Sequence, residues 1–465
     1  MPPKFGTSGL RGLVTDLSDD LVTSYVRAFI ATCPQGSAVH VGWDLRSSSP
    51  AIAQVVITAI RASGFKAISH GAVPTPALAL AAMTAGNSAV MITGSHIPAD
   101  RNGLKFYVPG GEVSKQDEQA ILSALQNRHA DVSSLGVLVH STRALPAYTD
   151  RYVQAFGPKA LIGMRIGVYA HSSVARDVLE ETLRALGADT VPLARSDVFI
   201  PVDTEAVDPK TRRLLAGWVQ EHGLDAIVST DGDGDRPMLA GPDGNIVQGD
   251  VLGSLTALHL GADIVVTPVS SNTQTNYMIQ ISQVIRTRIG SPFVIAAMEA
   301  VLLQNPNARV IGYEANGGFL LGFAAQGTAG LLPPLMTRDS LLPIISPLVA
   351  AQAAGQDLTT LAAALPPRFT RSDRVQGVPS AVSAALIADL RTNPQARAAF
   401  FDYIGPETDL DLTDGLRVQF EGGDIVHLRG SGNAPECRCY TEAETPARAA
   451  ELLKTYLDRL SAAFA

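Results

Sequence analysis

Apolar residues in the first third of the chain recur with two alternating periods, which predict helices and strands in turn. Proline and glycine separate the runs, and a helix opened by Pro76 leads into a strand of continuous apolar residues. The other predicted helices and strands in this region are 19–33, 38–42, 50–63, 66–69 and 89–93. This alternation predicts a mostly parallel sheet covered by helices.

The next two stretches of the chain repeat the pattern. A break in periodicity between Leu138 and Tyr148 predicts a boundary before them. The predicted strands are 165–169, 226–230, 263–268 and 308–312, and the predicted helices are 174–187 and 250–260. Three units with the same order of elements predict an internal repeat of one α/β fold.

The pattern changes around Pro366-Pro367. Short strands joined by the turn pairs Asp414-Gly415 and Gly422-Gly423 predict an antiparallel α+β module, closed by a helix that begins at Thr445-Pro446. The predicted strands are 409–413, 416–421 and 424–428. The fold class is therefore α/β, with domains over residues 1–145, 146–249, 250–366 and 367–465.

Composition and charge narrow the class of protein. The 465 residues, 46% hydrophobic, can build several cores, and a net charge of −8 argues against a general nucleic-acid or anionic-membrane surface. No apolar run reaches the length of a membrane span, so a cytoplasmic protein is expected. Three cysteines give no disulfide framework, and Cys437 and Cys439 are expected to be small buried residues. His40 and His70 are expected to make structural hydrogen bonds within strands.

The loop after the predicted strand 89–93 carries candidate chemistry. Gly94 frees the backbone for a tight turn and places Ser95 at the carboxyl end of the strand, where open α/β sheets bind ligands. A serine hydroxyl presented there beside His96 can act as a nucleophile or carry a phosphate. An ordinary turn has a similar composition, because Pro98 is a turn former.

A second loop, directly after the predicted strand 226–230, contains three carboxylates. Asp231, Asp233 and Asp235 alternate with glycines, so their oxygens can converge on one hard cation, magnesium or calcium. An EF-hand is excluded, because its sixth and twelfth positions require glycine and glutamate. Arg236 follows the carboxylates and indicates a phosphate in the same site, whereas a solvated acidic turn is the alternative.

Three further loops carry groups that suit phosphates or sugars. The segment 4–12 combines three glycines with Arg11, and 429–435 combines an arginine with small polar side chains. Glu314 and Asn316 can hydrogen-bond a polyhydroxylated ligand. The segment 4–12 matches neither the dinucleotide nor the P-loop fingerprint. An exposed arginine or a capping glutamate would give the same patterns.

Together these loops resemble the signatures of the α-D-phosphohexomutases of the phosphomannomutase/phosphoglucomutase type. They occur in family order at 5–12, 93–98, 231–236, 312–318 and 429–435. The resemblance implies three related mixed α/β domains and a smaller C-terminal α+β domain around a central cleft. It also implies an enzyme that interconverts hexose 6-phosphate and hexose 1-phosphate, of mannose, glucose or both, through a phosphoserine and a hexose 1,6-bisphosphate.

The resemblance also assigns expected roles to single residues. The expected catalytic residues are Ser95, His96, Lys105, Arg11 and Arg236. The expected ligands of one Mg²⁺ per chain are a phosphoserine oxygen of Ser95 and the carboxylates of Asp231, Asp233 and Asp235. The expected substrate-binding residues are Glu314, Asn316, Arg429, Ser431, Gly432 and Asn433. Hexose phosphates are the expected partners, hexose 1,6-bisphosphate the activator, and a monomer or homodimer the assembly, with neither nucleic acid nor membrane as a partner.

The sequence departs from the family pattern in two places. In the sugar loop, Asn316 replaces a serine and Gly318 replaces a histidine. Gly318, smaller than the histidine, is expected to leave room near the sugar and to remove one polar contact. Ile97 stands where many members have asparagine. Two alternatives remain open: a phosphoglucosamine mutase, which would share the catalytic residues, and a non-catalytic phosphosugar-binding protein, which would need neither the serine nor the carboxylates.

Overall fold

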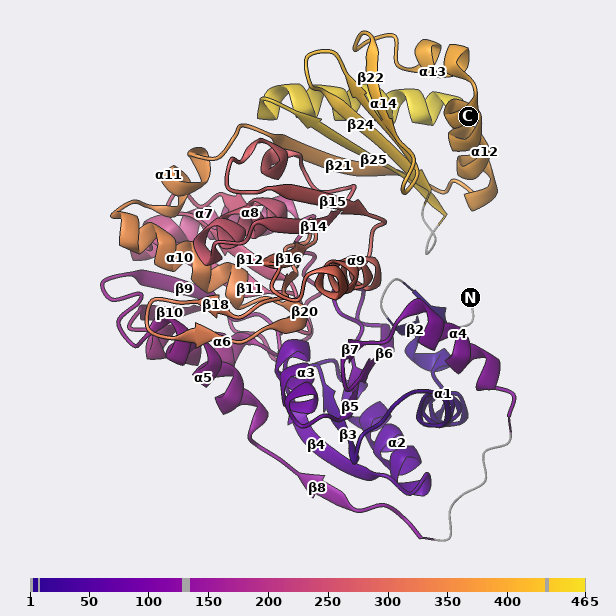
Figure 1. Cartoon of the computed structure of the whole chain (residues 1–465), viewed down its shortest axis with the longest axis vertical. Helices are drawn as coiled ribbons and strands as arrows, with labels where there is room; N and C mark the ends of the chain where they lie inside the picture. The colour runs from indigo at the N-terminus through magenta and orange to yellow at the C-terminus, as the bar shows by residue number, and fades with distance from the viewer. Residues whose placement is uncertain (1–2, 7–8, 128–133, 431–434, 465) are drawn as a thin grey trace.

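The computed structural model describes residues 3–6, 9–127, 134–430 and 435–464 (Figure 1). The expected phosphate-binding residues Ser431, Gly432 and Asn433 lie outside the described residues. The described chain forms four larger sheets and one two-stranded sheet, in chain order. The predicted α/β units followed by an antiparallel α+β unit are confirmed at the level of fold class.

The first sheet builds the amino-terminal unit, indigo to purple in Figure 1, with the order β1-β2-β6-β5-β3-β4-β8 and β7 paired to β6. Its strands are β1 Lys4–Phe5, β2 Leu10–Leu13, β3 Ala38–Trp43, β4 Lys66–Ala72, β5 Ser88–Ile92, β6 Arg101–Val108, β7 Gly111–Glu112 and β8 Leu138–His140. The β3–β4, β3–β5 and β4–β8 pairs are parallel, and the others are antiparallel. The prediction of a mostly parallel sheet is wrong, because the loop after β5 is too short for a crossover and β6 returns antiparallel.

Helices cover both faces of this sheet. They are α1 Asp19–Thr32, α2 Ser49–Ala62, α3 Thr75–Thr84 and α4 Lys115–Ala124, with a short 3₁₀ turn η1 at Val14–Asp16. Along β5, Val90 and Ile92 face the core shared with α1, α2 and α4, whereas Ala89 and Met91 pack in the cluster that contains α3 residues. A strand buried on both faces reads as a continuous apolar run, which is the pattern the sequence has there.

The second and third sheets share one plan, in which parallel strands end in an antiparallel hairpin. The second, β10-β9-β11-β12-β13, comprises β9 Arg165–Tyr169, β10 Asp189–Leu193, β11 Ala226–Thr230, β12 Pro237–Ala240 and β13 Ile246–Val247. The third, β15-β14-β16-β17-β20, comprises β14 Ile264–Pro268, β15 Gln283–Thr287, β16 Val310–Tyr313, β17 Phe319–Leu321 and β20 Leu335–Asp339, beside the small pair β18 Ala325–Gln326 and β19 Leu331–Leu332. The β5–β6, β11–β12 and β16–β17 hairpins occupy equivalent places in their sheets, which agrees with the predicted repeat.

One continuous core joins the second and third units. Leu183 of the second unit and Leu255 and Leu348 of the third belong to the same buried cluster. The helices of these units are α5 Ala144–Phe156, α6 Arg176–Ala185, α7 Pro209–His222, α8 Gly249–Leu260, α9 Ser291–Gln304, α10 Leu342–Ala354 and α11 Leu358–Ala363, with a 3₁₀ turn η2 at Gln274–Tyr277. The stretch 138–148, expected to be irregular, contains the edge strand β8 and the start of α5, so the irregular connection is confined to 141–143.

The carboxy-terminal unit is an antiparallel sheet, orange to yellow at the top of Figure 1, with the order β21-β25-β24-β23-β22. Its strands are β21 Phe369–Gln376, β22 Glu407–Asp411, β23 Leu416–Phe420, β24 Ile425–Gly430 and β25 Glu436–Ala443, and its helices are α12 Ser380–Thr392, α13 Pro394–Phe400 and α14 Pro446–Phe464. Gly415 and Gly422 have positive φ, as their hairpin turns require. Cys437 and Cys439 are fully buried in its core, as predicted.

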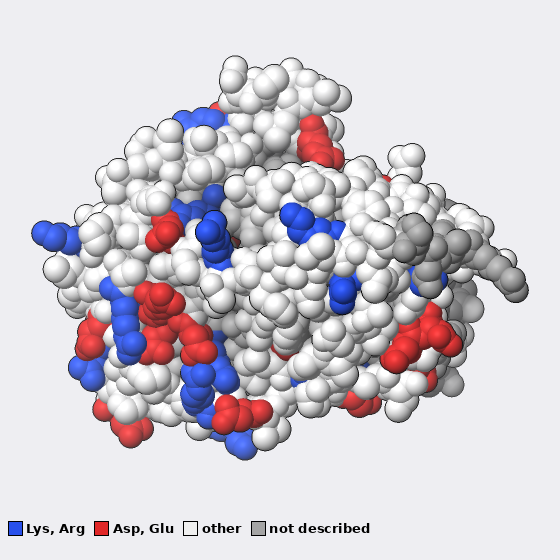
Figure 2. Space-filling model, turned by 90° about the horizontal axis from the view of Figure 1, so that it is seen from below, with Lys and Arg blue, Asp and Glu red and all other residues white. Residues whose placement is uncertain are grey.

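Charged side chains of both signs are intermixed on the face drawn in Figure 2. Among the described helices, none combines the length and the apolar composition needed to cross a bilayer. The charges that could bind a small anion therefore have to be sought in individual loops.

Candidate active site

The β5–β6 hairpin presents Ser95 in a buried position. Its φ of 54° lies in the left-handed region, and its backbone N–H donates to Oγ1 of Thr93 at 2.7 Å. The sequence predicted that Gly94 frees the backbone for a tight turn, but the φ of Gly94 is not positive, so glycine is required there for another reason. A Cβ on Gly94 would lie 2.6 Å from Cζ of Arg46, so this glycine makes room for a guanidinium.

Arg46, two residues after Asp44 at the end of β3, holds the whole loop in place. It is 1% exposed, and its Nε is 3.2 Å from Oδ2 of Asp44. Its two terminal nitrogens donate to the loop carbonyls of Ser95, Ile97, Pro98 and Arg101, at 2.6 to 3.0 Å. Sequence reasoning missed this residue, although an Asp-x-Arg pattern directly after a buried strand was available as a signal.

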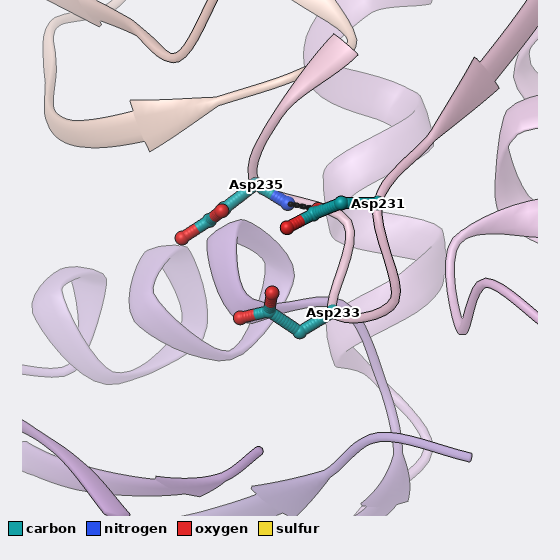
Figure 3. A group of neighbouring side chains, drawn as sticks. All are labelled: Asp231, Asp233 and Asp235. Carbon is teal, nitrogen blue, oxygen red and sulfur yellow. Dashed lines mark hydrogen bonds between the residues drawn. The ribbon is translucent and has the colours of Figure 1, made fainter. Parts of the chain in front are cut away.

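The β11–β12 hairpin carries the three carboxylates drawn in Figure 3, and it brings them against the serine loop. The hydroxyl of Ser95 donates to Oδ2 of Asp231 at 2.7 Å, while Oδ1 of Asp231 faces the backbone N–H groups of Asp235 and Arg236 at 3.2 and 3.3 Å. A Cβ on Gly232 would lie 2.7 Å from the carbonyl oxygen of Ser95. Gly232 therefore permits the two hairpins to touch.

Cations and hydroxyls from other elements hold the remaining two carboxylates. Lys105 of β6 places its Nζ 2.5 Å from Oδ2 of both Asp233 and Asp235. Thr75, at the start of α3, donates its hydroxyl to Asp233 at 2.6 Å and its N–H to the Asp233 carbonyl at 2.9 Å. Arg338 of β20 lies 2.8 Å from Oδ2 of Asp235. These contacts fix the direction of the carboxylates.

The donor set fits a hard divalent cation. One oxygen from each of Asp231, Asp233 and Asp235 lies within 4.8 Å of the others. Oδ1 of Asp233 and Oδ1 of Asp235 are buried without a hydrogen-bond partner, so two ligand oxygens are still available. Burial, together with the two neighbouring carboxylates, raises the pKa of Asp231 well above its usual range. A bound cation would relieve that repulsion and restore the anion.

His96 and Arg236 lie side by side at the edge of this cluster. Nδ1 of His96 accepts a hydrogen bond from Arg236 at 2.9 Å and lies 3.4 Å from the Ser95 hydroxyl. Burial, and then the charge of Arg236, lower the pKa of His96 to about 3. The imidazole is therefore neutral at physiological pH, with a lone pair rather than a proton on Nδ1.

Arg11 enters the same region from β2. In the β2–β6 ladder it faces Gly103, and a Cβ there would lie 2.6 Å from Arg11 NH1. Burial lowers the pKa of Arg11 to about 10, opposed mainly by the charge of Asp233. The guanidinium therefore stays charged at neutral pH and adds to the positive potential around the carboxylates.

The β16–β17 hairpin carries the expected sugar-binding pair. Glu314 is 4% exposed, and its backbone N–H donates to the carbonyl of Gly318 at 3.1 Å. The side-chain oxygen of Asn316 accepts from the N–H of Gly318 at 3.0 Å, and the Asn316 carbonyl accepts from Thr204 at 3.1 Å. Asn316 therefore shapes its own loop as well as being a candidate ligand group.

Arg429 lies at the end of β24, in the carboxy-terminal unit. Its Nε donates to Oδ1 of Asp414 at 3.0 Å, and Oδ2 of Asp414 accepts the backbone N–H of Ile289 from the third unit at 3.0 Å. Among the expected site residues, Ser95 and Lys105 contact the carboxylates directly, and His96 and Arg236 contact each other. Arg429, by contrast, is paired with Asp414. A phosphate at Arg429 would compete with that carboxylate.

Four family models match the chain in the order of its four units. They are described as phosphoglucomutase/phosphomannomutase alpha/beta/alpha domains I, II and III and the C-terminal domain, and they match residues 2–131, 146–244, 248–369 and 374–458. The chain belongs to the phosphoglucomutase/phosphomannomutase family. Comparison with a named member of the family shows how similar this chain is in sequence. A phosphomannomutase of Sinorhizobium fredii (strain NBRC 101917 / NGR234) is 44% identical over 97% of this chain and 98% of its own length.

Two further comparisons extend this result. A phosphoglucosamine mutase of Symbiobacterium thermophilum is 29% identical over 92% of this chain and 97% of its own length. The crystal structure of a phosphoglucomutase/phosphomannomutase family protein from Burkholderia thailandensis has the same fold, with a TM-score of 0.77 and 22% identity, covering 98% of this chain and 97% of that one.

Sequence reasoning about this family member missed three residues of the site: Arg46, Thr75 and Arg338. All three act through other side chains or loop carbonyls, and Thr75 and Arg338 meet carboxylates more than 100 positions away along the chain. It also expected Gly318 to leave room near the sugar. That expectation is wrong, because a Cβ on Gly318 would lie 2.8 Å from Cδ of Arg338, so the arginine fills the space.

Proposed function

We propose that this protein is a phosphohexomutase that interconverts the 6-phosphate and 1-phosphate of a hexose, with mannose and glucose phosphates as substrates. The observation that carries the proposal is the hydrogen bond from the Ser95 hydroxyl to Asp231, inside a buried cluster of three carboxylates and several cations. The 44% identity to a phosphomannomutase favours this activity over that of the phosphoglucosamine mutases, to one of which the chain is 29% identical.

In the proposed reaction Ser95 carries the phosphoryl group. The bond between phosphorus and the serine oxygen breaks while a bond to a hydroxyl of the hexose monophosphate forms, which gives a hexose 1,6-bisphosphate. The other phosphoryl group of that bisphosphate then returns to Ser95, so atoms balance over the cycle. Free hexose 1,6-bisphosphate would activate the protein, because it can phosphorylate Ser95 before the first turnover.

The surrounding cations would stabilise the charge of the transferring group. Arg11 and Arg236 supply fixed positive charge, and Lys105 and His96 are the proposed proton-transfer residues for the sugar hydroxyls. Asp231, Asp233, Asp235 and a phosphoserine oxygen would hold Mg²⁺. When bound, this ion supplies charge neutralisation to the phosphoryl group.

The substrate would be held at its two ends. We assign Glu314 and Asn316 to the sugar hydroxyls at positions 3 and 4, and Arg429 with the following loop, Ser431, Gly432 and Asn433, to the phosphate that is not reacting. Arg429 must then leave Asp414 for the phosphate. The domain over residues 1–145 would contribute the loops 5–12 and 93–98, and the domains over 146–249, 250–366 and 367–465 would contribute one loop each.

A coupled assay with mannose 1-phosphate, glucose 1-phosphate and glucosamine 1-phosphate, with hexose 1,6-bisphosphate present, tests the proposal. Mannose and glucose differ only at C2, so a site that reads O3 and O4 should give kcat/KM values for these two within about two orders of magnitude. A clear preference for glucosamine phosphate would make the protein a phosphoglucosamine mutase. Phosphosugar binding without turnover would make it a binding protein.

A further inference from the structure

One buried arginine, absent from the expected site, contacts acidic groups of all three α/β units. Arg338 is 3% exposed at the end of β20. Its NH2 lies 2.8 Å from Asp235 of the carboxylate loop, and its NH1 lies 3.5 Å from Glu314 of the sugar loop. Its Nε lies 3.9 Å from Glu112, in β7 of the first unit. A single guanidinium therefore links the proposed metal site, the proposed sugar site and the first unit.

The backbone beneath this arginine is held from several sides. Thr337 donates to Glu112 at 3.1 Å, and Ser340 donates to the carbonyl of Gly234, inside the carboxylate loop, at 2.7 Å. Between them, Asp339 accepts from the hydroxyls of Tyr148 and Tyr152 of α5. The segment 337–340 is thus a junction between the three units, and the side chain of Arg338 has a fixed base.

The sugar loop is shaped to admit this side chain. A Cβ at Gly318 would lie 2.8 Å from Cδ and 2.9 Å from Cγ of Arg338. The φ of Gly318 is not in the left-handed region, so its backbone suits any residue. Space, rather than backbone conformation, requires glycine at this position. A residue larger than glycine at position 318 would therefore clash with the side chain of Arg338 as it is placed here.

We propose that Arg338 is a positioning residue, which sets the carboxylate of Glu314 at a fixed place relative to the carboxylate loop, and that Gly318 is small in order to admit it. The inference rests on the proposed mutase function, because it gives Glu314 the role of orienting the sugar. An arginine can do this since its planar fork presents several N–H groups in fixed directions, whereas the ammonium of a lysine is a compact point charge.

Kinetics of Arg338→Lys give the first test. The variant keeps the charge but cannot span both carboxylates, so the sugar is held out of line with the phosphoserine. We expect kcat to fall about 100-fold, the usual effect of a misplacement near 1 Å, with a smaller change in KM. Arg397→Lys is the matched control, because Arg397 is also a buried arginine and is paired with Glu407 in the carboxy-terminal unit, away from the proposed site. Normal kcat in Arg338→Lys, or a loss confined to KM, would overturn the proposal.

A double-mutant cycle with Gly318→Ala gives the second test, and its thermal-unfolding readout needs no activity. The added methyl meets Arg338, so Gly318→Ala should lower both kcat and the thermal midpoint of unfolding in the native background. In the Arg338→Ala background the methyl enters vacated space, so its further effect on both should be much smaller. Additive effects would overturn the proposed fit of the two residues.

The two tests also separate this inference from the proposed function. If the native protein shows no mutase turnover, the proposed function fails, and the proposed role of Arg338 and Gly318 in orienting a sugar fails with it. The thermal cycle would then still show whether Gly318 is small in order to admit Arg338. If the native protein turns over and Arg338→Lys matches it, the inference fails while the function stands.

Discussion

At the scale of single residues, Ser95 combines burial with an unfavourable backbone. A non-glycine residue in the left-handed region costs on the order of 1 kcal/mol, and Ser95, at φ 54°, adopts it with its hydroxyl on Asp231. Arg46 binds the loop carbonyls on the other side and so offsets this strain. The loop is therefore preorganised to hold the serine oxygen against the carboxylates.

The first prediction concerns that serine. Ser95→Ala should abolish turnover without unfolding the protein, because it removes the group that we propose carries the phosphoryl and leaves the loop contacts of Arg46 in place. Intact-protein mass after incubation with hexose 1,6-bisphosphate should show a phosphorylated native protein and an unmodified variant. Ser123→Ala, on the exposed face of α4, is the control and should behave as the native protein does. Near-normal turnover by Ser95→Ala would refute the phosphoserine scheme.

The second prediction concerns Arg46. Arg46→Met removes the cation beside buried Asp44 and all the donors to the loop carbonyls. Breaking a buried ion pair in this way costs about 3–5 kcal/mol of folding free energy, and the released loop should also lower kcat. Urea unfolding and steady-state kinetics measure the two effects. Arg61→Met, at the partly exposed end of α2, is the control. An Arg46→Met protein with native stability and kcat would show that the loop needs no such clamp.

At the scale of elements, neighbouring strands of the first sheet carry a histidine pair, of which His40 is buried and His70 is half-buried. Nδ1 of His40 on β3 lies 2.9 Å from Nε2 of His70 on β4, while Nε2 of His40 faces the amide nitrogen of Asn87 at 3.3 Å. Asn87 can only donate with that nitrogen, so Nε2 of His40 accepts and Nδ1 donates to His70. The expected structural hydrogen bonds of these histidines are confirmed, and they require neutral rings.

The third prediction follows from that pair. Burial, and then His70, lower the pKa of His40 to about 4, below an unfolded value of about 6.5. Between these values the unfolded chain binds the extra proton, so this contribution is fully present above pH 6.5 and is lost as the pH falls towards 4. The free energy of unfolding should fall by up to about 3 kcal/mol over that range.

Urea unfolding at a series of pH values measures this effect. His40→Gln should flatten the profile, since the titrating ring is gone, whereas His140→Gln, at an exposed position of β8, should leave the profile as it is. An unchanged slope in His40→Gln would assign the acid sensitivity to other groups.

At the scale of the whole molecule, the proposed metal site is built from more than one unit. The carboxylates come from the second, Ser95, Thr75 and Lys105 from the first, and Arg338 from the third. A cation bound there would therefore stabilise the arrangement of the units as well as the transferring phosphoryl group.

The fourth prediction tests this link. Mg²⁺ at a hundred times its dissociation constant should stabilise the native protein by about 2.7 kcal/mol and raise the thermal midpoint. Asp233→Asn should lose most of that increase and at least about tenfold in kcat. Asp373→Asn, on exposed β21, is the control. Exhaustive chelation should abolish turnover and re-added Mg²⁺ restore it; full activity after chelation would contradict a metal-dependent reaction.

Local patterns predicted most elements of this protein. The strands β9 and β11 begin and end where the apolar runs do, and α14 begins at the predicted Thr445-Pro446 cap. Continuous apolar runs and capping residues depend only on neighbours in the chain, so the sequence contains the information directly. The same holds for Ser95 and for the three carboxylates, whose spacing with glycine marks a loop by itself.

Tertiary structure alone decided which side chains and strands contact one another. The clamp of Arg46 on the serine loop and the contact of Arg338 with Asp235 join residues far apart in sequence. The antiparallel return of β6 and the contact of Arg338 with Gly318 join nearer segments, but no local pattern specifies them. Such contacts depend on how the units pack, and a lone arginine in a strand looks the same whether it faces solvent or three buried carboxylates. The sequence by itself therefore determined which groups the protein carries, whereas the packing of the units decided which of them meet, because burial and charge pairing are properties of the folded arrangement.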